Sequence, residues 1–314
     1  MDFERLVQTS RLPEKPWRAE ALVRLVAGIA VCLFGGMGTA ATVVRYFGEP
    51  RHTATLWFLC FAAGTFACFA GAVCVLVRPW PFDNFLKKLL TLLLCIYGGF
   101  FLLWLAYRLV DPKSEIKNPT INVLIGILAF QGMALVLVHF FLREHQTGWA
   151  EGFGFRTNPG LAVFMGIVVG LVALPLTLYL NKLCIYILQH LSLNPQPQET
   201  VVVLQNTEGW QNRVVMGIAT IVIAPVAEEI LFRGILYPFI KRVGYPRLAW
   251  WITALVFAGV HFDLPTFVPL AFLALVLIWL YEHTGNLLAC IVTHSLFNAA
   301  NFVALYLMET KLHS

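Results

Sequence analysis

The sequence carries little charge. Asp, Glu, Lys and Arg make up 12% of its 314 residues and hydrophobic residues 59%, and the mean hydropathy is +0.75. A soluble globular chain has about a quarter of its residues charged and lacks long uncharged apolar runs. The composition therefore excludes an ordinary soluble domain. It predicts an all-α polytopic membrane protein, because a chain in lipid must satisfy its backbone hydrogen bonds internally.

Several recognisable motifs are also missing. The seven cysteines lie in apolar segments without a C-x-x-C, so we interpret them as small buried hydrophobic residues rather than disulfides or metal ligands. No H-E-x-x-H occurs, so no zinc-protease helix of that kind is visible. No A-x-A cleavage site follows the first apolar run, so we expect that run to be a true membrane span rather than a signal peptide.

Apolar runs, in contrast, are abundant. About 20 consecutive apolar residues suffice to cross the hydrocarbon core of a bilayer as a helix. The seventh and eighth runs are short enough to be tilted, buried or re-entrant, so we predict eight or nine transmembrane helices. The nine candidate spans are Leu22–Val44, Thr55–Val77, Leu89–Leu109, Ile121–Leu142, Leu161–Leu180, Val214–Ile240, Ala249–Phe262, Val268–Tyr281 and Leu287–Met308.

The positive charge of the chain also fits a membrane protein. The net charge is +5, and more Lys and Arg flank the spans on the side of the N-terminus than on the other side. By the positive-inside rule, this bias predicts a cytoplasmic N-terminus. We expect an integral, multi-pass protein of a bacterial inner membrane, with the lipid bilayer as a partner and no nucleic acid.

The two halves of the chain differ in the polarity of their spans. Residues 1–154 hold four predicted helices of unknown role, with no acidic residue in mid-span and with His139 as their one histidine, which we interpret as structural. Residues 155–314 carry polar groups at depth. Their longest polar connection contains NPQPQ, which cannot form a regular helix. Both a plain loop and an interfacial segment that gates access from the bilayer fit this stretch.

The run IVIAPVAEEILFRGIL places Glu228, Glu229 and Arg233 near the middle of a span. An ionised side chain at that depth costs at least about 2.5–3.5 kcal/mol, so each needs a partner. Glu229 and Arg233 are four residues apart on one helix face and can pair, whereas Glu228 points away from Arg233. Pro225 has no N–H to donate to the carbonyl of Ile221, so it can bend the helix.

Two later helices carry further polar side chains. His261 follows Phe257 by one turn in FAGVH, near the end of a helix. His294, Asn298 and Asn301 form a polar stripe on an otherwise apolar helix. Such groups need hydrogen-bond partners in hydrocarbon, and other buried polar groups are the natural ones. The candidate catalytic residues therefore lie on three C-terminal helices.

Together these side chains match the needs of peptide-bond hydrolysis. A carboxylate with a nearby histidine can activate water as a general base, and a second histidine with an asparagine can donate hydrogen bonds to an oxyanion. Alternatively, Glu228, His261 and His294 can ligate Zn²⁺ with one open position. Each residue alone also has a structural interpretation: an ion pair for the glutamate and arginine, and packing or interhelical hydrogen bonds for the histidines and the asparagine.

Three motifs, in this order, resemble those of a known family. EEILFR fits E-E-x-x-x-R, FAGVH fits F-x-x-x-H, and HSLFN fits H-x-x-x-N. From about residue 155 to 302 the sequence resembles the CPBP family, which comprises the type II CAAX prenyl endopeptidases and their bacterial relatives. The resemblance implies a CPBP-like intramembrane protease domain over residues 155–314. It also implies a glutamate-dependent peptide hydrolase, with a membrane-associated protein or peptide as substrate and no obligatory metal or other cofactor.

The resemblance further implies a role for each residue. These roles are water activation by Glu228 and His261, an oxyanion hole of His294 and Asn298, and support from Glu229, Arg233 and Phe257. Two other functions stay open. The lack of any substrate signal in the sequence leaves a non-catalytic immunity or scaffold protein of the same family. Buried carboxylates and histidines can also relay protons in a transporter, although transporters often repeat such features in both halves.

Overall fold

The computed structural model describes residues 12–30, 131–193 and 209–312. The chain divides into two compact units, one made of Met1–Trp17 with Leu142–Ser314 and the other of Arg18–Phe141. Every element among the described residues is a helix, so the predicted all-α fold is confirmed for them. The first four predicted spans lie wholly or partly outside these residues, and so does NPQPQ. The count of eight or nine helices and the division at residue 154 therefore stay predictions.

Four described helices are long and apolar enough to cross a membrane, so the protein is an integral membrane protein. They correspond to the fifth, sixth, eighth and ninth predicted spans. The seventh is α13 (Pro246–Gly259), whose 14 residues reach only about 21 Å, less than the hydrocarbon thickness of about 30 Å. The four are α8 (Pro159–His190), the helix Trp210–Arg242, α14 (Leu264–Thr284) and α15 (Leu287–Leu312), which is apolar enough as far as Leu305.

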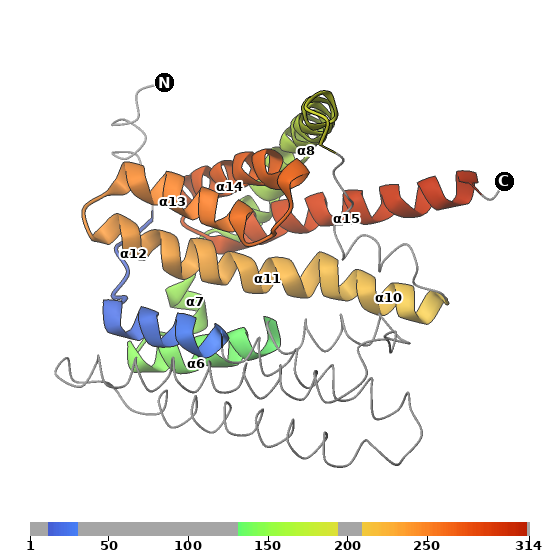
Figure 1. The fold of residues 1–314 in the computed structure, drawn as a ribbon. Coiled ribbons are helices and arrows are strands. Elements are labelled where there is room, and N and C mark those ends of the chain that lie inside the picture. The colour runs from blue at the N-terminus through green and yellow to red at the C-terminus, as the bar shows by residue number, and fades with distance from the viewer. Residues whose placement is uncertain (1–11, 31–130, 194–208, 313–314) are drawn as a thin grey trace, which may run out of the picture. The chain divides into compact units, whose positions relative to one another are not determined.

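The helix Trp210–Arg242 switches from the α-helical to the π-helical hydrogen-bond pattern at two places. Two of its parts are π-helical turns, in which a carbonyl accepts from the N–H five residues on instead of four. It runs alongside α13 near its C-terminal end and alongside α15 in its middle (Figure 1). Its parts are α10 (Trp210–Ile218), η3 (Ala219–Ile223), α11 (Ala224–Glu229), η4 (Ile230–Leu236) and α12 (Tyr237–Arg242).

The first π turn changes which carbonyl Pro225 leaves open. The N–H of Ala224 donates to the carbonyl of Ala219, five residues back. The next donor in this register would be Pro225, which has no N–H, so the carbonyl of Thr220 loses its helical partner. The sequence prediction, made with α-helical spacing, names the carbonyl of Ile221, and that carbonyl stays a prediction. The difference arises because periodicity alone does not reveal a π turn.

Close packing against α8 fixes the position of α15. A Cβ at Gly166 would lie 2.6 Å from the carbonyl oxygen of Ala289, so only glycine lets the two helices approach this closely. At the same contact the hydroxyl of Thr293 donates to the carbonyl of Gly166 at 2.7 Å, in a buried position. Thr293 directly precedes His294, so this contact also fixes the place of that imidazole.

The turn between α13 and α14 holds His261. The helix α13 ends at Gly259, and α14 begins at Leu264. The side chain of Asp263 caps α14 by accepting the N–H of Thr266 at 3.1 Å. His261 is therefore presented from a short, capped turn rather than from within a helix.

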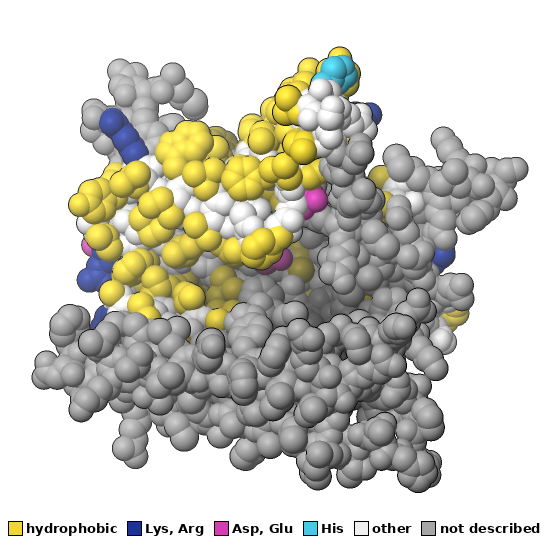
Figure 2. Space-filling model, viewed as in Figure 1, with side chains coloured by type: hydrophobic (Ala, Val, Ile, Leu, Met, Phe, Trp, Pro, Cys, Tyr) yellow, Lys and Arg dark blue, Asp and Glu magenta, His cyan; other side chains and the backbone are white. Residues whose placement is uncertain are grey.

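Apolar side chains dominate the outer face of the described helices (Figure 2). On α13, for example, Trp251 is 57% exposed and its neighbours Leu248 and Leu255 are also exposed. An exposed apolar band on a helix bundle matches a surface that faces lipid.

Candidate active site

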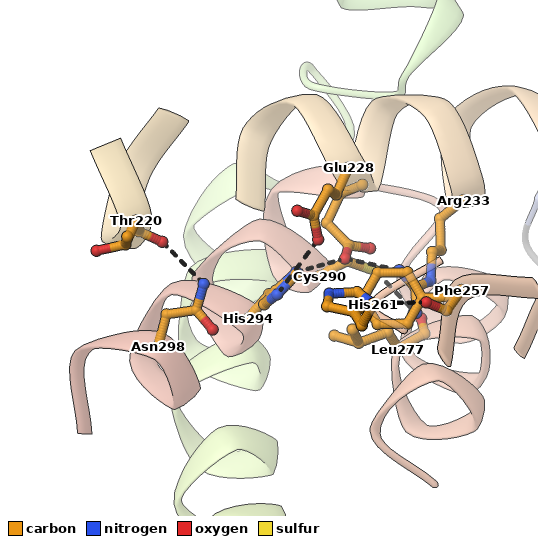
Figure 3. A network of polar contacts seen from close by, with 10 residues as sticks. Thr220, Glu228, Arg233, Phe257, His261, Leu277, Cys290, His294 and Asn298 are labelled. Atoms are coloured by element: carbon orange, nitrogen blue, oxygen red, sulfur yellow. Dashed lines mark hydrogen bonds and ion pairs between the residues drawn. The ribbon is translucent and has the colours of Figure 1, made fainter. Parts of the chain in front are cut away.

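Polar side chains from three helices and one turn meet in the interior of the domain (Figure 3). Because α11, η4 and α15 are in contact and α13 packs against η4, residues far apart in the sequence come together here. The side chains are Glu228 and Glu229 of α11, Arg233 of η4, Phe257 of α13, His261 of the turn, and His294 and Asn298 of α15.

Glu229 and Arg233 form the ion pair that their spacing predicts. Arg233 Nη1 donates to Glu229 Oε1 at 2.8 Å, and both side chains are fully buried. The guanidinium carbon of Arg233 also lies 4.2 Å from the centre of the Phe257 ring, which is a cation–π contact. Because Arg233 neutralises Glu229, the pair lowers the free-energy cost of burying two carboxylates.

His294 lies between the two carboxylates. Its Nδ1 is 2.8 Å from Glu229 Oε1, and its Nε2 is 3.8 Å from Glu228 Oε2. Because a carboxylate accepts, the network assigns the Nδ1 proton to the bond with Glu229, which leaves Nε2 facing Glu228. With the imidazole protonated, the four charges of Glu228, Glu229, Arg233 and His294 sum to zero.

The two carboxylates differ in their surroundings. Glu229 is fully enclosed, whereas the side chain of Glu228 is 16% exposed and accepts no hydrogen bond from any described residue. The predicted separation of the two around the helix is therefore confirmed. Glu228 is the carboxylate that a substrate or a water molecule can reach.

Phe257 is the apolar centre of the cluster. Its ring centre lies 5.0 Å from that of His261 and 5.7 Å from that of His294, in addition to the contact with Arg233. Phe232 of η4 packs on it edge-on, at 5.2 Å. Because this ring is fully buried, it sets the spacing between the two imidazoles and the guanidinium.

His261 forms its hydrogen bond with the end of α13, and its predicted role in water activation with Glu228 stays a prediction. Its Nδ1 is 2.7 Å from the carbonyl of Phe257, and the ring is half-buried. Within the described part of the chain it is His294, not His261, that comes within ion-pair distance of Glu228. The reason is that His261 follows the end of α13, where its ring bonds back to a carbonyl of the last helical turn.

Asn298 holds α15 to the first π turn. Its Nδ2 donates at 2.8 Å to the carbonyl of Thr220, the carbonyl that Pro225 leaves without a helical partner. The second N–H of the amide makes no hydrogen bond to a described residue. Asn301, the third member of the polar stripe, instead donates to the carbonyl of Phe297 in its own helix, at 3.0 Å.

Several buried atoms of the ion pair lack partners. Glu229 Oε2 and the Nε and Nη2 atoms of Arg233 make no hydrogen bond within the described structure. Buried polar groups are usually satisfied, and exceptions mark places where water or a ligand enters. A water molecule at these three atoms would complete the hydrogen bonds of the ion pair.

The donors of the predicted zinc set do not form a metal centre. No group of three or more His, Cys, Asp and Glu side chains that could hold a metal ion occurs among residues 12–30, 131–193 and 209–312. Glu228, His261 and His294 therefore do not converge on one point. A zinc ion bound by these three residues stays a prediction.

Two contributors to the site escape sequence reasoning. Thr220 acts through a main-chain carbonyl, so its side chain gives no signal. Trp17 lies far from the motifs, yet its indole Nε1 donates at 3.0 Å to the buried carbonyl of Gly234, next to Arg233. In the π register of η4 the N–H of Tyr237 donates to the carbonyl of Phe232, so Pro238, which has no N–H, leaves the neighbouring carbonyl of Arg233 without its helical donor. This proline is the one sequence signal for open main-chain groups beside Gly234.

Comparison with known families agrees with this geometry. Residues 210–300 match the family model of the type II CAAX prenyl endopeptidase Rce1-like proteins. The match runs from the start of α10 into α15 and contains all seven side chains of the cluster. The chain thus carries an Rce1-like domain over these residues, as the resemblance of the motifs predicts, and the matched family is a protease family. No curated protein and no solved structure matches the chain.

Proposed function

We propose that the protein is an intramembrane endopeptidase, which hydrolyses peptide bonds of membrane-associated proteins or peptides with water activated by Glu228. The observation that carries this proposal is the arrangement around Glu228. This carboxylate is open on one side, accepts no hydrogen bond from a described residue, and lies 3.8 Å from His294 at the centre of an apolar helix layer. An ionisable group at such depth is a functional candidate by default. The Rce1-like match over the same residues supports a peptidase.

Glu228 acts as the general base in this mechanism. It takes a proton from a water molecule, and the water oxygen attacks the carbonyl carbon of the scissile peptide bond. The Nε2 of His261, whose Nδ1 is held by its own helix, positions this water. When the carbon–nitrogen bond breaks, Glu228 returns the proton to the leaving amine. The products are a carboxylic acid and an amine, so atoms and charges balance.

His294 and Asn298 stabilise the oxyanion that forms during the attack. The protonated imidazole donates from Nε2 while Nδ1 stays bonded to Glu229, and Asn298 donates through the N–H that Thr220 leaves free. Donors that are already fixed in place cost no reorganisation when charge develops. Glu229 accepts from Nδ1 and keeps His294 in this orientation, and Arg233 keeps Glu229 in place.

The direct test compares protein termini in native membranes. Cells express wild type, Glu228→Gln and Glu282→Gln at equal folded levels, where Glu282 is a buried carboxylate outside the cluster. New termini are expected with wild type and Glu282→Gln and absent with Glu228→Gln, and their sequences identify the substrate. Identical termini in all three strains, with the phenotype of the Glu228→Gln strain intact, would contradict proteolysis and favour a scaffold or immunity protein.

A further inference from the structure

A second polar feature lies away from the catalytic cluster, at the ends of the helices. It is a cavity of about 480 Å³ that opens to the surface. The cavity lies where α8 begins and where α14 gives way to α15, which is the surface level of the membrane for helices of this length. Its lining residues are Pro13, Lys15, Ala150, Glu151, Gly154, Arg156, Thr157 and Gly285.

The frame of this cavity is rigid. Gly154 has a left-handed φ of 73°, and a Cβ there would collide with the carbonyl oxygen of Gly285. The side chain of Asn286 donates to the carbonyl of Thr157 at 2.8 Å, and the N–H of Leu287 donates to the carbonyl of Phe153 at 3.0 Å. The loop before α8 is thereby joined to the turn before α15. The cavity is preformed and does not need to close around a ligand.

Lys15 brings an incompletely paired cation to the cavity. Its side chain is 5% exposed, and its one hydrogen bond within the described chain is a long contact of 3.5 Å with the carbonyl of Glu151. Burial lowers the pKa of Lys15, and the Glu151 carboxylate offsets only part of this effect. A buried ammonium with unused donors is costly until an anion meets it.

Arg156 supplies a second cation on the same lining. Its guanidinium is exposed and makes no ion pair or hydrogen bond with a described residue. Among the described lining residues Glu151 is the one acidic side chain, so their formal charge is +1. Arginine and lysine together are a common pair of phosphate ligands, the first as a two-pronged donor and the second as a point charge.

We propose that this cavity binds the phosphate of a phospholipid headgroup through Lys15 and Arg156. The volume falls within the range of ligand-sized clefts, about 300–1,000 Å³, and exceeds the need of a phosphate ion alone. A headgroup also reaches the level of the helix ends without leaving the bilayer, whereas its acyl chains lie along the exposed apolar residues of α8, such as Leu161 and Phe164. The site is separate from the catalytic cluster and needs no proteolysis.

The test measures lipid binding to the full chain in a detergent without phosphate. Short-chain phosphatidylglycerol, dioctanoylglycerol and inorganic phosphate are compared by native mass spectrometry and by thermal unfolding. Phosphatidylglycerol is expected to bind and to raise the Tm of the wild type. Dioctanoylglycerol, which lacks the phosphate, and inorganic phosphate, which lacks the rest of the lipid, are expected to bind at least about tenfold more weakly.

Three variants assign the binding to residues. Arg156→Gln and Lys15→Met are expected to weaken phosphatidylglycerol binding about tenfold each, the effect of losing one charge-assisted hydrogen bond. Lys15→Met without lipid is expected to unfold at the wild-type temperature or above, since it removes an under-paired buried charge. Lys182→Gln, at an exposed lysine in the second half of α8, is the matched control and should bind like wild type.

Several results would overturn the proposal. Equal binding of dioctanoylglycerol would show that the site does not recognise the phosphate. Equal binding of inorganic phosphate would show that the site binds soluble anions and not a lipid. An equal loss of phosphatidylglycerol affinity in Lys182→Gln would show that binding depends on the overall surface charge and not on the cavity. Wild-type affinity in Arg156→Gln would separate the cavity from lipid binding. Arg156 is exposed, so this variant decides the question even where Lys15→Met fails to fold.

Discussion

The domain buries two glutamates, each beside a cation, and the two regions are built differently. Glu282 of α14 accepts from Tyr237 and Lys241 of α12, with Lys241 Nζ 2.6 Å from Oε1 and 2.8 Å from Oε2. Both oxygens of Glu282 are therefore used. Glu229 of α11 meets Arg233 and His294 through Oε1 alone, and its Oε2 has no partner in the described structure.

The Glu282 cluster has the features of an ion pair that stabilises the fold, whereas the Glu229 cluster has the features of a catalytic site. At Glu282 one acid meets one base and a hydroxyl, and Lys241 is 22% exposed, so the pair sits near water. In the other cluster an additional carboxylate, Glu228, is left open. A buried ion pair by itself says little about function, but unused donors and acceptors beside an accessible carboxylate indicate a place for a substrate.

The largest expected effect is on turnover in Glu228→Gln. Removal of a general base lowers the rate of proton transfer, so we expect cleavage to fall by about 10²–10⁴-fold. The neutral amide keeps the shape of the side chain, and the Tm should stay within a few degrees of wild type. The rate of cleavage per folded molecule in detergent or liposomes measures this, once a substrate is known from its termini.

Glu282→Gln is the matched control for that experiment. It makes the same chemical change at the other buried glutamate, so its cleavage rate per folded molecule should match that of wild type. If both variants lost cleavage equally, the contrast between the two clusters would not reflect catalysis.

The next effect is on stability and concerns Glu229→Ala. This change strands the fully buried Arg233 and removes the partner of His294 Nδ1, so we expect a loss of about 3–5 kcal/mol in the free energy of unfolding. Glu228→Ala should cost much less, because Glu228 is partly exposed and accepts no described hydrogen bond. Unfolding by denaturant in detergent compares the two, and equal losses would refute the division of roles.

A double variant gives this prediction a second check. In Glu229→Leu with Arg233→Met both charges are gone, and apolar side chains of similar size replace them. Such replacements are often neutral or stabilising, so most of the lost stability should return. Cleavage should stay low, because the Nδ1 of His294 would lose its acceptor and the imidazole would no longer be held in place. Recovery of both stability and cleavage in the double variant would mean that the ion pair is needed for neither property.

Sequence reasoning succeeded where the geometry is local to one helix. The pairing of Glu229 with Arg233, and the different direction of Glu228, follow from the helical repeat alone. The contact of His294 with both glutamates does not, because it depends on how deeply α15 packs against α8 at Gly166. The bond from Asn298 to the carbonyl of Thr220 does not follow either, since periodicity does not reveal the π turn at that carbonyl.

A smaller loss of stability is expected in Glu282→Ala. Lys241 keeps contact with water and can turn outward, so its charge is not trapped as that of Arg233 is. The hydroxyl of Tyr237 loses its acceptor in a buried position, which costs about 1–3 kcal/mol. Thermal unfolding next to Glu229→Ala measures the difference. A loss of stability as large as that of Glu229→Ala would show that contact with solvent does not reduce the cost of leaving Lys241 without its carboxylate.

The smallest effect concerns the support that the catalytic helix receives from Trp17. Phenylalanine at this position keeps an aromatic ring but loses the N–H that bonds to the carbonyl of Gly234. An unpaired carbonyl is tolerated better than an unpaired N–H, so Trp17→Phe should cost about 1 kcal/mol of stability. Because Gly234 adjoins Arg233, cleavage should fall slightly as well.

Unfolding by denaturant in detergent and cleavage per folded molecule measure the two effects of Trp17→Phe. A loss of stability with no change in cleavage would assign the effect to the packing of Trp17 against His145, whose ring centre lies 5.3 Å away, and not to the hydrogen bond with Gly234.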